Sequence, residues 1–399
     1  MVSDGIQVAE RECMRTTLQW CAGLFFGFRI CITYLGFQVD PRTGSAVTLA
    51  LSGCLFAAAL IDTFGDTTFS MSTVFHGRTM RWLLAYIVLA GASVAWTQAE
   101  SSSVAAGYWA GMAADVATVA LLLRGVAIQR QLDAMMRGFV VGTLVVALVA
   151  WLSPTLPDMR IGNEDFLHPN GLGLEFALAF FMAQHLTAKN RHWRWAAIAL
   201  GVSLLRTISK TSIIACMVAE CFYLLRERQM SRRIKVQIAL AASVVIAAFW
   251  GLLEAYFSMY TANGDQAETL TGRTTIWALS FLMAMERPWV GHGLYSYRAL
   301  IPAFGTFEPW HAHNELLQQF FELGLFGVVV TAGLYLALWR AGGLSAKNHP
   351  DWPYGKLAAV LVLFSLVHGL TDTVNFGLSL PLWLFVGLAI ATDQVEVTA

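Results

Sequence analysis

The sequence predicts an all-α polytopic membrane protein with about twelve transmembrane helices. Hydrophobic residues make up 57% of the 399 residues, charged residues only 13%, and the mean hydropathy is +0.58. Soluble globular proteins carry roughly 25% charged residues. Apolar runs of about 20 residues, the length that crosses a bilayer, recur along the whole chain. These observations favour a single integral membrane domain over residues 1–399.

The predicted spans follow one another with short connections. The polar start of the chain, residues 1–16, lacks the pattern of a cleavable signal peptide, so we expect the first span to be retained. The spans lie near residues 17–37, 46–65, 81–97, 104–124, 136–152, 170–187, 193–209, 211–226, 236–256, 314–339, 356–373 and 376–393.

The distribution of Lys and Arg predicts the orientation. With a cytoplasmic N-terminus, 18 of the 26 Lys and Arg residues fall on inner segments, as the positive-inside rule requires. The long hydrophilic loop at 257–312 then faces the periplasm, and the C-terminus is cytoplasmic. Within that loop, 272–286 is too short to span and too apolar for open solvent, so we predict an interfacial helix that ends before Pro288.

Several classes of protein are disfavoured by composition. The net charge is zero, which gives no support for a nucleic-acid partner. All 6 cysteines lie in or beside apolar runs and none forms a CxxC pair, so neither a disulfide framework nor a cysteine metal site is indicated.

The cations predicted on the outer side gather next to helix ends. Arg160 precedes the span near 170, Arg206 and Lys210 flank the turn before 211, and Arg273 opens the interfacial helix. Helix N-termini carry partial positive charge and free N–H groups, which suit a phosphate. This arrangement predicts an anion site; snorkelling and pairing with acids are the structural alternatives. The acids expected to balance these cations are Asp165, Glu175 and Asp372.

A His-Asn pair stands where the long loop enters an apolar helix. His311-Ala-His313-Asn314-Glu315 is followed by Gly324-Leu-Phe-Gly327. A histidine titrates near neutral pH and suits general-base chemistry on a sugar hydroxyl. The neighbouring Asn314 can cap the helix or orient an acceptor.

Two further histidine patterns leave alternatives open. His311, His168 and Asn170 are candidates to orient an acceptor, and the segment His168-Pro169-Asn170 can instead merely cap a helix. The His-x-His spacing of His311 and His313 suits two ligands of a metal ion, and His292 and Glu308 are candidates for a third ligand. Neither candidate stands at a spacing that is characteristic of a metal site. We therefore predict no metal and no cofactor.

At this point the chain resembles the O-antigen ligase and polymerase superfamily, which includes exopolysaccharide polymerases. The resemblance covers about 160–330. It rests on the His313-Asn314 pair, the Gly324-x-x-Gly327 motif, an upstream Gly-Arg273-x-x-x-Trp segment, Pro288-x-x-Gly291-x-Gly293 and an outward Ser-Lys210-Thr turn.

The resemblance implies a GT-C-like, inverting, metal-independent glycosyltransferase in the bacterial inner membrane. It takes a glycan from an undecaprenyl-diphosphate carrier at the periplasmic face and passes it to an acceptor, either a growing chain or lipid A-core. By the match, His313 is the base and Arg273 binds diphosphate. Lys210 stands where many relatives have Arg, which leaves Arg206 as its alternative; Arg160 is a further candidate.

Polymerase and ligase activities are both consistent with this family. Val328-Val329 replaces the Thr-Thr common in ligases, and the Ser-Lys-Thr turn favours an exopolysaccharide polymerase. Membrane lipids and a chain-length regulator protein are candidate partners. A transporter or flippase is the competing class, but the chain shows no repeat of the kind transporters carry.

Overall fold

The computed structural model describes most of the chain. The described residues are 2–39, 43–64, 77–124, 128–154, 156, 159–162, 167–226, 230–237, 239–240, 243–244, 270–303, 308–348, 353–374 and 381–397. Their secondary structure is helical, without strands. The predicted span at 236–256 and the loop residues 257–269 lie mostly or wholly outside the described residues.

Helices occupy eleven of the twelve predicted spans. Their bounds are α1 Val2–Val39, α2 Thr43–Phe64, α4 Arg78–Ser93 with a 3₁₀ turn Val94–Trp96, α5 Ser102–Leu122, α6 Ile128–Leu152, α7 Pro169–Thr187, α8 Trp193–Thr207, α9 Lys210–Arg226, α13 Glu315–Asn348, α14 Tyr354–His368 and α15 Leu382–Val397. Six helices among the described residues are long and apolar enough to cross a membrane. The chain is therefore a polytopic membrane protein, and the count of twelve stays a prediction.

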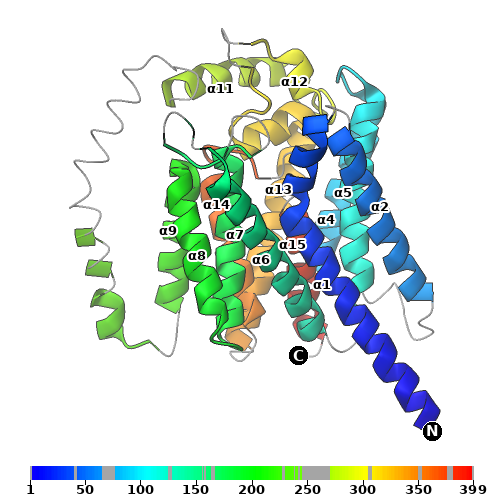
Figure 1. Cartoon of the computed structure of the whole chain (residues 1–399). Helices are drawn as coiled ribbons and strands as arrows, with labels where there is room; N and C mark the ends of the chain where they lie inside the picture. The colour runs from blue at the N-terminus through cyan, green and yellow to red at the C-terminus, as the bar shows by residue number, and fades with distance from the viewer. Residues whose placement is uncertain are drawn as a thin grey trace.

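One end of the bundle is crossed by a helix that does not run along the bundle (Figure 1). Figure 1 shows α11 (Leu270–Ala284) lying across one end of the bundle, beside the short α12 (Tyr297–Leu300), while both chain termini lie at the other end. A helix is therefore present where one was predicted at 272–286, and its interfacial location stays a prediction.

Helices α1 and α6 pack backbone against backbone. Gly23 and Gly27 on α1 face Gly138 and Gly142 on α6, and each pair has the spacing of a small-xxx-small motif. A Cβ on Gly23 would lie 1.9 Å from the carbonyl oxygen of Met135, so only glycine permits this approach. Close contact of this kind holds helices together where the surrounding lipid offers no hydrophobic driving force.

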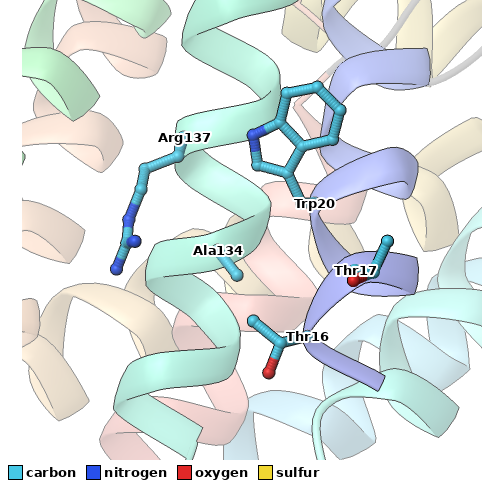
Figure 2. Close-up of a pocket in the computed structure, with 5 residues that line it drawn as sticks. All are labelled: Thr16, Thr17, Trp20, Ala134 and Arg137. Carbon is cyan, nitrogen blue, oxygen red and sulfur yellow. The ribbon is translucent and has the colours of Figure 1, made fainter. Parts of the chain in front are cut away.

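A cavity opens beside this contact, toward the end of α1 that carries the N-terminus. It has a volume of about 350 Å³, and Figure 2 shows its lining residues: Thr16, Thr17 and Trp20 on α1, and Ala134 and Arg137 on α6. The hydroxyls of Thr16 and Thr17 donate to carbonyls of their own helix. Because its lining residues on α1 lie toward the N-terminus, the cavity is away from the end of the bundle crossed by α11 (Figure 1).

Aromatic packing fills the centre of the bundle. Trp383 on α15 is fully buried and stacks on Phe26 of α1 with ring centroids 5.0 Å apart, and it also contacts Phe139 of α6. A buried ion pair joins Arg29 of α1 to Asp115 of α5. The rigid core built in this way carries the loops at the α11 end.

Candidate active site

Asn314 caps the N-terminus of α13. Its side-chain Oδ1 accepts a hydrogen bond from the backbone N–H of Leu317 at 3.0 Å, which caps the helix. Its Nδ2 donates to the carbonyl of Leu370 at 3.0 Å. Asn314 therefore ties the His-Asn motif to the loop after α14, which is a structural task that the sequence had left as one of two alternatives.

Glu315 strengthens the same connection. Its backbone N–H donates to the carbonyl of Gly369 at 2.8 Å, and its buried carboxylate accepts from the N–H of Val374 at 2.7 Å. The loop 369–374 thus lies directly against the start of α13. This brings Asp372 to the two histidines of the motif.

His311, His313 and Asp372 form a compact group. Nδ1 of His313 lies 3.5 Å from Oδ1 of Asp372, and Nδ1 of His311 lies 3.8 Å from the same oxygen. The two imidazole rings have centroids 4.2 Å apart. His313 takes a left-handed backbone conformation with φ of 48°, which is costly for a residue with a side chain and is typical of functional sites.

The two histidines differ in chemistry. Nδ1 of His311 accepts a hydrogen bond from the backbone N–H of His313 at 3.2 Å, which requires that nitrogen to be unprotonated. Burial and then the nearby charge of His313 lower the pKa of His311 to about 3, although Asp372 opposes the shift. His311 is therefore neutral at physiological pH.

Asp372 is held in its ionised form. Burial alone would raise its pKa, but the hydrogen bond from His313 and the charges of His313, His311 and His368 keep that pKa well below its usual value. Its Oδ1 also accepts from the N–H of Thr373 at 2.8 Å. An ionised carboxylate facing Nδ1 orients an imidazole and leaves Nε2 as the atom for proton transfer.

Helix α11 is tied to this group at two points. The guanidinium of Arg273 donates to the carbonyl of Thr371, and the indole N–H of Trp277 donates to the carbonyl of Ala312 at 2.9 Å. These carbonyls belong to residues that directly precede Asp372 and His313. The first turn of α11 therefore brings Arg273 to the loop that carries Asp372.

The Ser-Lys-Thr turn at the start of α9 docks on the same loop. The hydroxyls of Thr211 and Thr371 lie 2.8 Å apart, and Oγ of Ser212 lies 3.2 Å from Nε2 of His368. Lys210, the first residue of α9, is close enough to Arg160 and Arg273 for their charges to interact.

Arg160 enters from the loop between α6 and α7. It is 6% exposed, donates from Nε to the carbonyl of Thr207 at 2.9 Å and from Nη2 to Oδ1 of Asn170 at 2.8 Å. The imidazole of His168 accepts from the backbone N–H of Asn170 at 3.3 Å, so His168 caps α7. His168 and Asn170 thus position Arg160 and the start of α7.

Arg206 makes different contacts. Its guanidinium donates to the carbonyl of Met159 and lies 6.0 Å from the ring of Trp151. Of the two alternatives at the Ser-Lys-Thr turn, the structure groups Lys210 with Arg160 and Arg273. Three like charges held near one another repel, and an anionic ligand removes that repulsion.

The glycine motifs explain how α11 and α13 are joined. α13 is broken at Gly324, where φ is 66° and ψ is −161°. A Cβ there would lie 2.3 Å from the carbonyl carbon of Trp289, and a Cβ on Gly291 would lie 2.4 Å from that of Glu322. Only glycine allows two backbones to approach this closely in these conformations.

At the break in α13, backbone N–H and C=O groups of the helix form hydrogen bonds with the segment 288–293 instead of with the helix itself. The N–H groups of His292 and Gly293 donate to the carbonyls of Phe321 and Glu322, at 2.9 and 2.8 Å. The N–H of Leu325 donates in return to the carbonyl of Pro288 at 2.8 Å. We call this contact the glycine lock; it fixes the C-terminal side of α11 to the helix that follows His313.

The group that could bind a metal ion in the structure differs from the one considered from the sequence. His292 is occupied elsewhere, with Nδ1 2.6 Å from Gln98 and Nε2 2.9 Å from the carbonyl of Met283, and Glu308 pairs with Arg298. His311, His313 and Asp372 each offer one atom, all within 4.8 Å of one another, which is compact enough for a cation. The third member is an acid that spacing along the chain did not reveal.

The other acids fall elsewhere. Glu175 is buried inside the bundle, where it accepts from Thr143 at 3.3 Å, and Asp165 lies outside the described residues. Of the three acids proposed to balance the outer cations, the structure places Asp372 at the histidines.

Comparison with known proteins matches part of this sequence to one family. Residues 195–332 match the family model described as O-antigen ligase; they run from α8 to the middle of α13 and include Lys210, Arg273 and His313. Arg160 and Asp372 lie outside the matched range.

Two curated relatives are similar to longer stretches of the chain. The exopolysaccharide production protein ExoQ of Rhizobium meliloti is 23% identical over 334 residues, which cover 76% of this chain and 73% of the relative. The O-antigen ligase of Pseudomonas aeruginosa is 30% identical over 173 residues, which cover 43% of this chain and 39% of the relative. The chain is thus similar to O-antigen ligases and to an exopolysaccharide production protein, and the family model itself matches residues 195–332.

Proposed function

We propose that the protein is a polysaccharide polymerase that transfers glycan from an undecaprenyl-diphosphate carrier to an acceptor hydroxyl, at the periplasmic face of the bacterial inner membrane. The observation that carries the proposal is the position of the His313–Asp372 pair beside Arg160, Lys210 and Arg273. A base and an anion site at one end of a membrane bundle are what a lipid-diphosphate donor and a sugar acceptor require.

The chemistry is a single displacement. The acceptor oxygen forms a bond to C1 of the donor sugar while the bond from C1 to the carrier phosphate breaks. The acceptor proton goes to Nε2 of His313, and Asp372 stabilises the imidazolium that results. The cations Arg160, Lys210 and Arg273 stabilise the negative charge on the departing diphosphate. Attack from the face opposite the leaving group inverts the configuration at C1.

Asp372 supports a metal-free route. An ionised carboxylate at Nδ1 of His313 is the arrangement that raises the basicity of an imidazole and fixes its orientation. The cations on α9, α11 and the loop before α7 supply the charge stabilisation that a metal ion would otherwise provide.

Polymerase activity is favoured over transfer to lipid A-core by two observations. The similarity to an exopolysaccharide production protein spans most of the chain, whereas the similarity to an O-antigen ligase spans less than half. Val328-Val329 also follows the second glycine of the motif, where ligases often carry Thr-Thr. Ligase activity is the second candidate because of the family match itself.

The test uses purified protein in liposomes with an undecaprenyl-diphosphate-linked oligosaccharide and EDTA. We expect wild type to make a ladder of longer glycans, and His313→Ala to make none. His192→Ala removes an exposed histidine at the start of α8 and is the matched control. Transfer only after addition of lipid A-core would make the protein a ligase. A full ladder from His313→Ala would overturn the assignment of the base, and loss of activity with EDTA would overturn the metal-free route.

A further inference from the structure

A second cavity lies at the α11 end of the bundle, between the start of α5 and α12. Its volume is about 220 Å³, and its lining residues are Glu100, Ser101, Val104, Tyr295, Arg298 and Ala299. Figure 1 shows α12 beside α11, at the end opposite the termini. The cavity is therefore on the same side of the bundle as the candidate active site.

Trp310 connects this cavity to the histidines. The guanidinium carbon of Arg298 lies 4.2 Å from the centroid of the Trp310 ring, and the Trp310 side chain is 41% exposed. Trp310 directly precedes His311 in the chain. The residue whose ring covers Arg298 is therefore joined directly to the segment that carries His311 and His313.

The second wall of the cavity is aromatic and conformationally constrained. Tyr295 has a φ of 65°, in the left-handed region, and its ring stacks on Tyr108 of α5 with centroids 4.2 Å apart. The two phenol oxygens lie 3.3 Å apart. A strained backbone that is held by a ring stack gives Tyr295 a fixed position at the edge of the cavity.

The polar groups around these rings are of mixed type. Glu100 supplies acceptors, Arg298 supplies donors, and Glu308 lies 3.4 Å from Arg298. A sugar presents an apolar C–H face, which packs on aromatic rings, and a rim of hydroxyls, which both donate and accept hydrogen bonds. The combination of fixed rings with carboxylate and guanidinium groups matches that surface.

Charge separates this cavity from the cation cluster. Two carboxylates and one guanidinium leave it net negative, which disfavours a phosphate or an anionic lipid headgroup. The larger cavity between α1 and α6 lies toward the opposite end, and its hydroxyls bond to their own helix. We propose that the cavity between α5 and α12, with Trp310, is a saccharide subsite that holds the acceptor glycan beside His313. This inference rests on the proposed glycosyl transfer.

The first test is direct binding to the full-length protein in nanodiscs. The probe is a soluble oligosaccharide of the host polysaccharide, followed by saturation-transfer NMR. We expect Trp310→Ala to weaken binding by about tenfold, the factor that one lost aromatic contact corresponds to. We expect Glu100→Gln to weaken binding by about the same factor, because it removes a charged hydrogen-bond acceptor. Trp195→Ala is the matched control, because Trp195 is an exposed tryptophan with Arg194 at 5.0 Å from its ring, outside this cavity. His313→Ala should still bind.

The second test separates the subsite from the chemistry. We expect Trp310→Ala and Glu100→Gln to raise KM for the acceptor about tenfold with little change in kcat or in KM for the lipid-linked donor. If both variants keep wild-type binding and wild-type acceptor KM, the subsite is wrong while the transferase stands. If anionic vesicles displace the oligosaccharide, the cavity is a lipid site instead. If wild type binds saccharide through these residues but transfers none, the subsite stands and the proposed reaction fails.

Discussion

The carboxylate of Asp372 lies 3.5 Å from Nδ1 of His313, although Asp372 lies in the loop after α14 and His313 in the loop before α13. The contact exists because Asn314 and Glu315, at the start of α13, hydrogen-bond to Leu370, Gly369 and Val374. The residues that form the helix cap are therefore also those that assemble the acid–base pair.

The first prediction concerns this pair. His313→Ala should lower kcat by about 10²–10⁴-fold, the contribution of a general base. Asp372→Asn should lower it by about 10–100-fold, because the imidazole loses the carboxylate that orients it. Since the two residues act as a unit, the double variant should be no slower than His313→Ala alone. Single-turnover rates in liposomes measure this, and additive losses would contradict it.

The second prediction separates Lys210 from Arg206. Lys210→Ala should raise KM for the lipid-linked donor, because the proposed diphosphate site, which Lys210 shares with Arg160 and Arg273, loses one positive charge. Lys210→Arg should retain most of the affinity. Arg206→Ala should leave the donor KM near wild type, since Arg206 contacts Met159 and Trp151. Equal effects of the two alanine variants would show that this division is wrong.

The third prediction concerns the glycine lock. Gly324→Ala should lower the free energy of unfolding by about 1–3 kcal/mol, because the conformation at this position is suited only to glycine and the new Cβ meets Trp289. Gly343→Ala, further along α13, is the control, since nothing lies within 4 Å of its Cβ position. Thermal unfolding in detergent compares the two. Equal melting temperatures would mean that the break in α13 is not held by backbone contact.

The fourth prediction links stability to pH through His311. Burial and the charge of His313 lower its pKa from 6.5 to about 3. Between these values the unfolded chain binds a proton that the folded chain does not, so the stabilisation is present above pH 6.5 and is lost as the pH falls toward 3. The lowered pKa of Asp372 acts in the same direction, below its usual value of 3.8.

His311→Gln tests this linkage. As the pH is lowered from about 7.5 to about 4.5, the melting temperature of the wild type should fall. The melting temperature of the variant should fall less, because the variant lacks the titrating group. His192→Gln is the control, since His192 is an exposed residue. A variant with the same pH dependence as wild type would place the titration on another residue.

The sequence by itself determined the helical membrane class, the positions of eleven helices and the presence of a further helix at 272–286, because each depends on local hydropathy and length. It also identified His313, Arg273, Lys210 and Arg160 as candidates, because cations and histidines at helix ends stand out against an apolar chain.

Only the tertiary structure decided which of these side chains meet. Asp372 joins His313 through hydrogen bonds between the starts and ends of distant helices, and no local pattern records such a contact. The same holds for the different contacts of Lys210 and Arg206, and for the Gly291–Gly324 contact, which joins two motifs that are separate in the sequence. Hydropathy fixes which segments enter the membrane, whereas the approach of one backbone to another depends on packing across the whole bundle.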